Sequence, residues 1–296
     1  MSVLVVARWT LLEARRRRLV LAGVALSVAF VALFALGYAL LYHDQQRAVV
    51  EAEVLGAGVL SAREELLAVS SLLLVLGLYG VQFLGALLGL FLGVASVSPE
   101  IDSGALHAVL ARPLSRLQYL LGRFLALAGL LAAYVLVMSG ALLLTARVVA
   151  GFTPGDARRV VGLMLLEVLI LLAVSLLGST VLPTLANGVV MLALFGVAWL
   201  GGILGFVATI PPGNELLANL GTAAGLLLPA DAVWRGASFH VLPPSFLAAT
   251  SLAGGAQDGP PFVSTAPMAP AMLAWALAYP VACLAVAVAA FRRRDL

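Results

Sequence analysis

The chain has 296 residues, of which 63% are hydrophobic and only 10% are charged, and its formal net charge is +3. Because a soluble domain carries about 25% charged residues, this composition excludes a water-soluble globular protein and indicates a polytopic membrane protein. All 17 basic residues are arginines. The absence of lysine excludes a standard P-loop, which needs a lysine to reach the nucleotide phosphates.

The N-terminal stretch, residues 2–18, has the pattern of an amphipathic helix. Val5, Trp9 and Leu12 fall on one helical face, and Arg8 lies off it. Since a tryptophan beside arginines suits the depth of the lipid headgroups, we expect a helix that lies in the membrane interface. A helical extension of the first span into the cytosol is the alternative.

Six apolar runs are long enough to cross the hydrocarbon core, which takes about 20 residues. They are residues 19–42, 66–97, 117–146, 160–182, 188–210 and 271–291. The second and third are longer than a span needs, so we expect tilt or a protruding end. These runs predict an all-α, polytopic membrane protein with six transmembrane helices in one domain that covers residues 1–296.

Glycines recur at a spacing of four residues in two of these spans. The second span contains Gly85, Gly89 and Gly93, and the fifth contains Gly201 and Gly205. Glycines four residues apart form a flat groove that another helix backbone can approach closely. We therefore expect tight helix packing at both places, against a helix of the same chain or of a second copy.

Glu167 is the one acidic residue inside a predicted span. Because an ionisable residue inside the membrane is costly, it usually has a function, and we consider that Glu167 lies on a substrate pathway. The residue lies about two helical turns from the end of its span that follows Arg158 and Arg159. A structural pairing with a polar group near the interface is therefore the alternative.

The placement of the arginines orients the chain. With six spans, eleven of the 17 arginines fall on the side of the two termini and six on the other side. Since cytoplasmic loops carry an excess of basic residues, we expect both termini in the cytoplasm and the protein in the cytoplasmic (inner) membrane.

Residues 211–270 would then form an external region, which holds nine of the 14 prolines. Its apolar pieces are too short to span, so we expect them to lie against the outer interface or to dip back into the bundle. Within it, Asp231 and Arg235 have the spacing of a helical ion pair, and we expect Trp234 to be an interface anchor.

The most polar internal loop, residues 98–116, lies between the second and third spans. It begins with Ser-Pro-Glu, in which the serine suits an N-cap, the proline the first helical position and the glutamate the first turn. This helix should stop before Pro113, and Ser115 with Gln118 predicts a capping box that starts the third span.

We interpret this loop as a cytoplasmic surface helix that is jointed to a spanning helix. Such a surface helix could transmit motion from a soluble motor protein to the bundle of transmembrane helices. The candidate coupling residues are Glu100, Asp102, Gly104, His107, Arg112, Pro113 and Arg116. The sequence predicts no catalytic residue, no metal site, no cofactor bound by this chain and no nucleic-acid binding, since its three histidines lie in three separate loops.

Residues 100–123 match the pattern E-x-x-x-G-x-L-x-x-x-L-x-x-P-x-x-R-x-x-Y-L-L-G-R. With the six spans and the closing FRRRDL, this pattern resembles the permease subunits of type-2 ABC exporters. The family usually has threonine where Ala105 stands and lysine where Arg123 stands. Within the family, the chain is similar to the group that includes the permease of the nitrous-oxide-reductase maturation exporter, and LPADAVWRGAS before the last span contributes to that similarity.

The resemblance implies that residues 100–112 are a coupling helix that contacts a separate P-loop ATP-binding subunit, which holds ATP and magnesium. It also implies a homodimer of this chain with two such subunits, and an external accessory protein is a further candidate partner. Two other functions stay open. An ion-coupled secondary transporter would need inverted repeats and midplane charges, and a non-transporting membrane assembly factor is equally consistent with the missing catalytic residues.

Overall fold

The computed structural model describes residues 8, 18–56, 59–102, 115–208, 213–252 and 261–293. Within these residues the regular structure is helical throughout, with no strand, which confirms the predicted all-α class. The predicted interfacial helix, residues 2–18, lies almost entirely outside the described residues.

Among the described residues, six helices are long and apolar enough to cross a membrane, as predicted. They are α2 (Arg18–Leu55), α3 (Val59–Val94), α6 (Arg116–Ala150), α7 (Ala157–Val181), α8 (Thr184–Val207) and α12 (Pro270–Arg293). The first continues well past its predicted end at residue 42, because residues 43–55 contain neither glycine nor proline. It stops before Gly56, whose φ of 67° lies in the left-handed region that favours glycine.

The described residues also form four shorter helices: α4 (Ser98–Asp102), α9 (Glu215–Leu227), α10 (Ala230–Phe239) and α11 (Pro244–Leu252). Helices α9 and α10 meet at an angle of 103°. Asn214 starts α9, since its side chain accepts hydrogen bonds from the backbone N–H groups of Leu216 and Leu217. After the bend, α10 packs against α7 and α8, so this part of the predicted external region dips back into the bundle.

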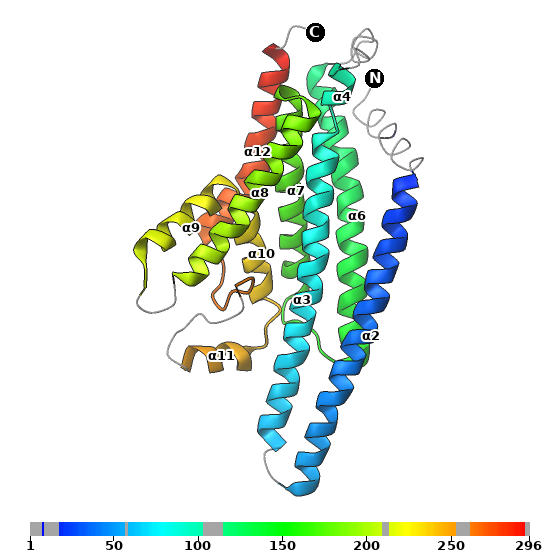
Figure 1. Ribbon diagram of the computed structural model, residues 1–296, viewed down its shortest axis with the longest axis vertical. Coiled ribbons are helices and arrows are strands. Elements are labelled where there is room, and N and C mark those ends of the chain that lie inside the picture. The colour runs from blue at the N-terminus through cyan, green and yellow to red at the C-terminus, as the bar shows by residue number, and fades with distance from the viewer. Residues whose placement is uncertain are drawn as a thin grey trace.

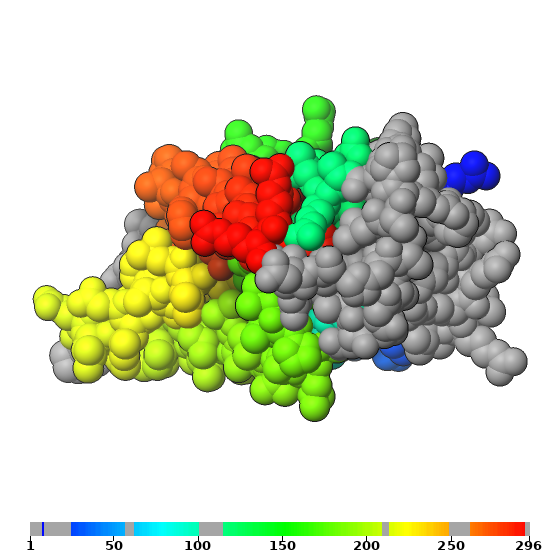
Figure 2. Space-filling model, turned by 90° about the horizontal axis from the view of Figure 1, so that it is seen from above, coloured from blue at the N-terminus to red at the C-terminus, as the bar shows by residue number. Residues whose placement is uncertain are grey.

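Helix α7 is the centre of the bundle and contacts α3, α6, α8, α10 and α12. In Figure 1, α4 and the last turns of α12 lie at one end of the bundle, which we call the α4 end. The α2–α3 hairpin extends past the first turn of α7 at the other end, which we call the hairpin end. Figure 2 views the molecule from the α4 end, where the end of α12 lies beside the start of α6 and α9 lies at the left edge.

The glycines of α3 allow it to pack closely against α7 of the same chain. A Cβ atom added at Gly89 would lie 3.2 Å from the backbone oxygen of Val168, and one added at Gly93 would lie 2.5 Å from Cβ of Ser175. Gly85 faces α7 as well, where its added Cβ would lie 3.2 Å from Val168. This stripe of glycines therefore lets the two backbones approach where any side chain would separate them.

The second glycine pair lies between α8 and α9. A Cβ atom added at Gly201 would lie 2.2 Å from Cβ of Ala224, while one at Gly205 would meet nothing within 4 Å. The backbone of Gly205 is nevertheless close, because a Cβ added at Gly221 on α9 would lie 3.0 Å from its nitrogen. Here too the partner helix belongs to the same chain.

Candidate functional site

The start of α4 is tied to the end of α7. The Ser98 hydroxyl donates to the backbone oxygens of Ser179 and Leu182, both at 3.0 Å. In return, Oγ of Ser179 accepts from the backbone N–H groups of Val97 at 2.9 Å and Ser98 at 3.0 Å. Ser98 and Ser179 are buried, so these bonds are shielded from water.

The predicted N-cap residue, Ser98, is the first residue of α4, and its hydroxyl donates to the end of α7. The physical reason is that α7 ends at Val181, and the last carbonyl groups of a helix have no partner within it. Ser98 lies where it can satisfy two of these carbonyls.

Glu100 points toward the first turns of α6. The Tyr119 hydroxyl donates to Oε2 of Glu100 at 2.5 Å, and the Arg123 guanidinium group forms an ion pair with Oε1. The guanidinium group also lies over the Tyr119 ring, 5.5 Å from its centroid. Because the Glu100 and Arg123 side chains are only 26% and 12% exposed, solvent screens this pair weakly. Sequence reasoning did not foresee it, although Tyr119 and Arg123 stand one helical turn apart.

The start of α6 has the predicted capping box. The side chain of Ser115 accepts from the backbone N–H of Gln118, and the Gln118 side chain accepts from the backbone N–H of Ser115. The next residue, Arg116, donates to the backbone oxygens of Phe291 at 2.6 Å and Arg292 at 3.0 Å. A cation at the C-terminal end of a helix is favourable, so Arg116 joins α6 to the end of α12.

The other candidate coupling residues are not part of this network as described. Gly104, His107, Arg112 and Pro113 lie outside the described residues. Asp102 is the last residue of α4, and its side chain is also outside them. The structure thus anchors Glu100 and Arg116 separately, at the two edges of the loop. We call this cluster the coupling joint, and it consists of Ser98, Glu100, Ser115, Arg116, Tyr119 and Arg123.

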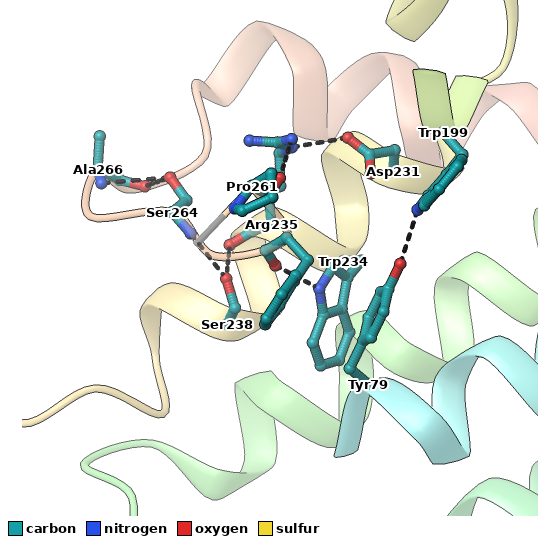
Figure 3. A network of polar contacts seen from close by, with 10 residues as sticks. Tyr79, Trp199, Asp231, Trp234, Arg235, Ser238, Pro261, Ser264 and Ala266 are labelled. Atoms are coloured by element: carbon teal, nitrogen blue, oxygen red, sulfur yellow. Dashed lines mark hydrogen bonds and ion pairs between the residues drawn. The ribbon is translucent and has the colours of Figure 1, made fainter. Parts of the chain in front are cut away.

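A second polar cluster lies inside the bundle around Glu167, which is 4% exposed. Glu167 lines a small cavity together with Gln82 of α3 and Asp231 of α10. The predicted pair of Asp231 and Arg235 is confirmed, since Nε of Arg235 lies 2.7 Å from Oδ2 of Asp231. Figure 3 shows this pair near Trp199, together with Ser264, which is hydrogen-bonded to Ser238 and to Ala266 in the segment before α12.

Trp234 does not anchor the protein at the membrane interface, so that prediction is wrong. The side chain is 2% exposed, and its indole N–H donates to the backbone oxygen of Phe262 at 2.7 Å. Its ring lies 5.2 Å from that of Tyr79 on α3. The reason is that α10 packs against α7 inside the bundle, which buries the face that carries Trp234.

Comparison of the sequence with protein families agrees with this architecture. The family described as "ABC-2 family transporter protein" matches residues 4–296, nearly the whole chain. The chain belongs to the ABC-2 transporter family. It is therefore a membrane transport component of the permease type, with several spanning helices. A comparison with curated proteins found no match.

The coupling joint gives this ABC-2 permease a mechanical connection between three spanning helices. Ser98 ties α4 to α7, Glu100 ties it to α6, and Arg116 ties α6 to α12. The apolar contact beneath them, with Val97, Tyr119 and Phe291 among its buried residues, excludes water from the same place. These contacts hold α4, α6, α7 and α12 together at this end of the bundle.

We expect Ser179→Ala to loosen the joint in this ABC-2 permease. The change removes the acceptor for two buried backbone N–H groups, and leaving a buried donor unsatisfied costs about 1–3 kcal/mol. The midpoint of thermal unfolding, measured on the purified chain, should fall by several degrees. Ser175→Ala is the matched control on the same helix, because the Ser175 hydroxyl donates to Leu171 within α7. Equal midpoints for the two variants would contradict this account of Ser179.

Proposed function

We propose that this ABC-2 permease is the membrane subunit of an ATP-driven exporter. In this proposal the loop at residues 98–116 receives motion from a separate P-loop ATP-binding subunit, and the coupling joint passes it to the bundle. The observation that carries the proposal is the anchoring of both edges of the loop. One edge is bonded to α6 and α7, and the other is bonded to α12.

The composition supports a division of labour between two polypeptides. The chain has no lysine and so no standard P-loop, which supports the proposal that ATP and magnesium bind to a separate subunit. A surface helix can transmit motion to the bundle only if it is held rigidly where it meets the bundle. The contacts of Glu100 and Ser98 supply that stiffness, because charge-assisted and buried hydrogen bonds hold a narrow geometry.

The distribution of arginines supports the orientation that this function needs. The α4 end carries Arg116, Arg123, Arg292 and Arg293, and we infer that it faces the cytoplasm, as do both termini. The protein would then lie in the cytoplasmic membrane with its hairpin end outside. We further propose that two copies of the chain form the transport unit with two ATP-binding subunits, and that the hairpin end is where an external accessory protein would bind.

Purification of the chain from its native membrane tests this proposal. We expect a P-loop ATPase to co-purify with the wild type and to be lost from the double variant Asp102→Arg/Arg112→Glu, which reverses two charges of the loop. The matched control is Glu53→Arg/Arg63→Glu, which swaps an exposed ion pair on the hairpin without changing the net charge. Equal recovery of an ATPase with both double variants, or no ATPase with the wild type, would contradict the proposal.

A further inference from the structure

The cavity around Glu167 contains two buried oxygen atoms that lack partners. Oε2 of Glu167 and Oε1 of Gln82 have no hydrogen-bond partner among the described residues, and the two side chains are only 4% and 1% exposed. Both oxygens are acceptors, and both side chains line the same cavity between α3, α7, α8 and α10. Because an unsatisfied buried acceptor is costly, this arrangement favours a ligand that brings hydrogen-bond donors.

One of the two acidic side chains of the cavity has no ion-pair partner among the described residues. Asp231 is already paired with Arg235, and the Arg235 guanidinium group also donates to the backbone oxygen of Pro261. Glu167 has no ion-pair partner among the described residues. An unpaired carboxyl group buried in a bundle is normally kept neutral by a proton, and a bound cation could replace that proton and pair with the carboxylate.

The remaining wall of the cavity is aromatic. Tyr79, Trp199 and Trp234 line it, as do Phe83 and Phe195, whose ring centroids lie 6.0 Å apart. Neither indole N–H is free to satisfy Glu167. Trp199 donates to the Tyr79 hydroxyl at 2.7 Å, and Trp234 donates to Phe262. Aromatic faces attract cations electrostatically, so the aromatic rings and the Glu167 carboxylate both favour a cationic ligand.

We propose that this cavity binds a monovalent cation that donates hydrogen bonds, either ammonium or the protonated amine of a cargo molecule. The Glu167 carboxylate and the Gln82 carbonyl oxygen accept its N–H groups, and the aromatic rings surround it. The free space suits a group of about the size of a water molecule, which is the size of ammonium. Calling the ligand a cargo rests on the proposed function, but the binding site does not.

The set of oxygen atoms distinguishes this ligand from a metal ion. A hard divalent cation takes about six or more oxygen ligands, whereas the described residues contain no group of three or more histidine, cysteine or acidic side chains that could hold a metal. A wider groove between α8 and α9 is also lined by Asp231 and Arg235. Asp231 thus stands between the groove and the inner cavity, so an amine attached to a larger molecule could approach from this side.

Titration of the full chain in lipid nanodiscs with ammonium chloride tests the site at constant ionic strength and neutral pH. The readout is tryptophan fluorescence, since Trp199 and Trp234 line the cavity. We expect a saturable change with ammonium, none with sodium or with tetramethylammonium, which has no N–H donor, and binding at least tenfold weaker in Glu167→Gln. Glu65→Gln, an exposed residue on the hairpin, is the matched control and should bind as the wild type does.

Two further measurements make the result decisive. Glu167→Gln keeps the shape of the side chain and removes a buried charge, so the variant should fold, and its elution volume and thermal midpoint check this. Gln82→Leu removes the second acceptor and should weaken binding as well. An equal response to sodium, no response to ammonium, or unchanged affinity in both variants would overturn the proposal. The titration needs neither ATP nor a partner, so its failure would leave the association with an ATP-binding subunit untouched.

Discussion

Replacing Glu100 with arginine is expected to uncouple the partner ATPase from the bundle. The variant places a positive charge beside Arg123 and removes the acceptor of the Tyr119 hydroxyl. Breaking a fully buried ion pair costs about 3–5 kcal/mol, and for this partly buried pair we expect about 2 kcal/mol. Since about 1.4 kcal/mol corresponds to a factor of ten in an equilibrium constant, the contact of α4 with α6 should weaken more than tenfold, and stimulation of ATP hydrolysis by the reconstituted permease should fall with it.

The reciprocal exchange provides the control for this prediction. Arg123→Glu alone should be as damaging, while Glu100→Arg combined with Arg123→Glu restores opposite charges and should recover part of the stimulation. Such a recovery isolates the interaction between the two residues from their separate contacts. A double variant as inactive as the single ones, or a single Glu100→Arg variant with wild-type stimulation, would show that the pair does not serve coupling.

Gly93→Leu is expected to separate α3 from α7 and to destabilise the bundle. Even the first side-chain atom would lie 2.5 Å from Cβ of Ser175 and 3.0 Å from the backbone oxygen of Leu172. Overpacking a close contact costs about 1–3 kcal/mol or more, and a backbone atom cannot move aside as a side chain can. We expect a large fall in the thermal midpoint and loss of the monodisperse peak in gel filtration.

Gly140→Leu on α6 is the matched control for the helix packing. Gly140 is also a helical glycine, but an added Cβ there would meet nothing within 4 Å. Because leucine has a higher helix propensity than glycine, this control should fold as well as the wild type. Equal loss of folding in both variants would mean that the close contact between α3 and α7 is not what Gly93 provides.

Much of this fold could be predicted because it depends on local patterns. Length and hydrophobicity define the six spans, and the Ser115–Gln118 capping box and the Asp231–Arg235 pair depend on residues three or four apart. The error at the end of α2 has a local cause as well. The polar residues after position 42 end the apolar run but not the helix, since helix formation continues in water until a residue such as Gly56 stops it.

The missed and mistaken features depend on contacts between distant segments. Periodicity gives no indication that Ser98 would meet the end of α7, or that Arg116 would meet the end of α12. Trp234 looked like an interface anchor because an amphipathic helix near a span has the same composition whether it lies on the membrane or within the bundle. The sequence identifies Glu167 as an intramembrane acid. It does not predict that Gln82 and the aromatic side chains line the same cavity, because they come from other helices that pack around Glu167.

In the proposed exporter, a soluble ATPase acts on this permease at the loop of residues 98–116. A photo-crosslinking amino acid introduced at His107 tests it most directly in the native membrane, with the same group at the exposed Glu64 on the hairpin as the control. We predict that position 107 captures a P-loop ATPase and that position 64 does not. Capture of no ATPase from position 107, or equal capture from both positions, would contradict the claim.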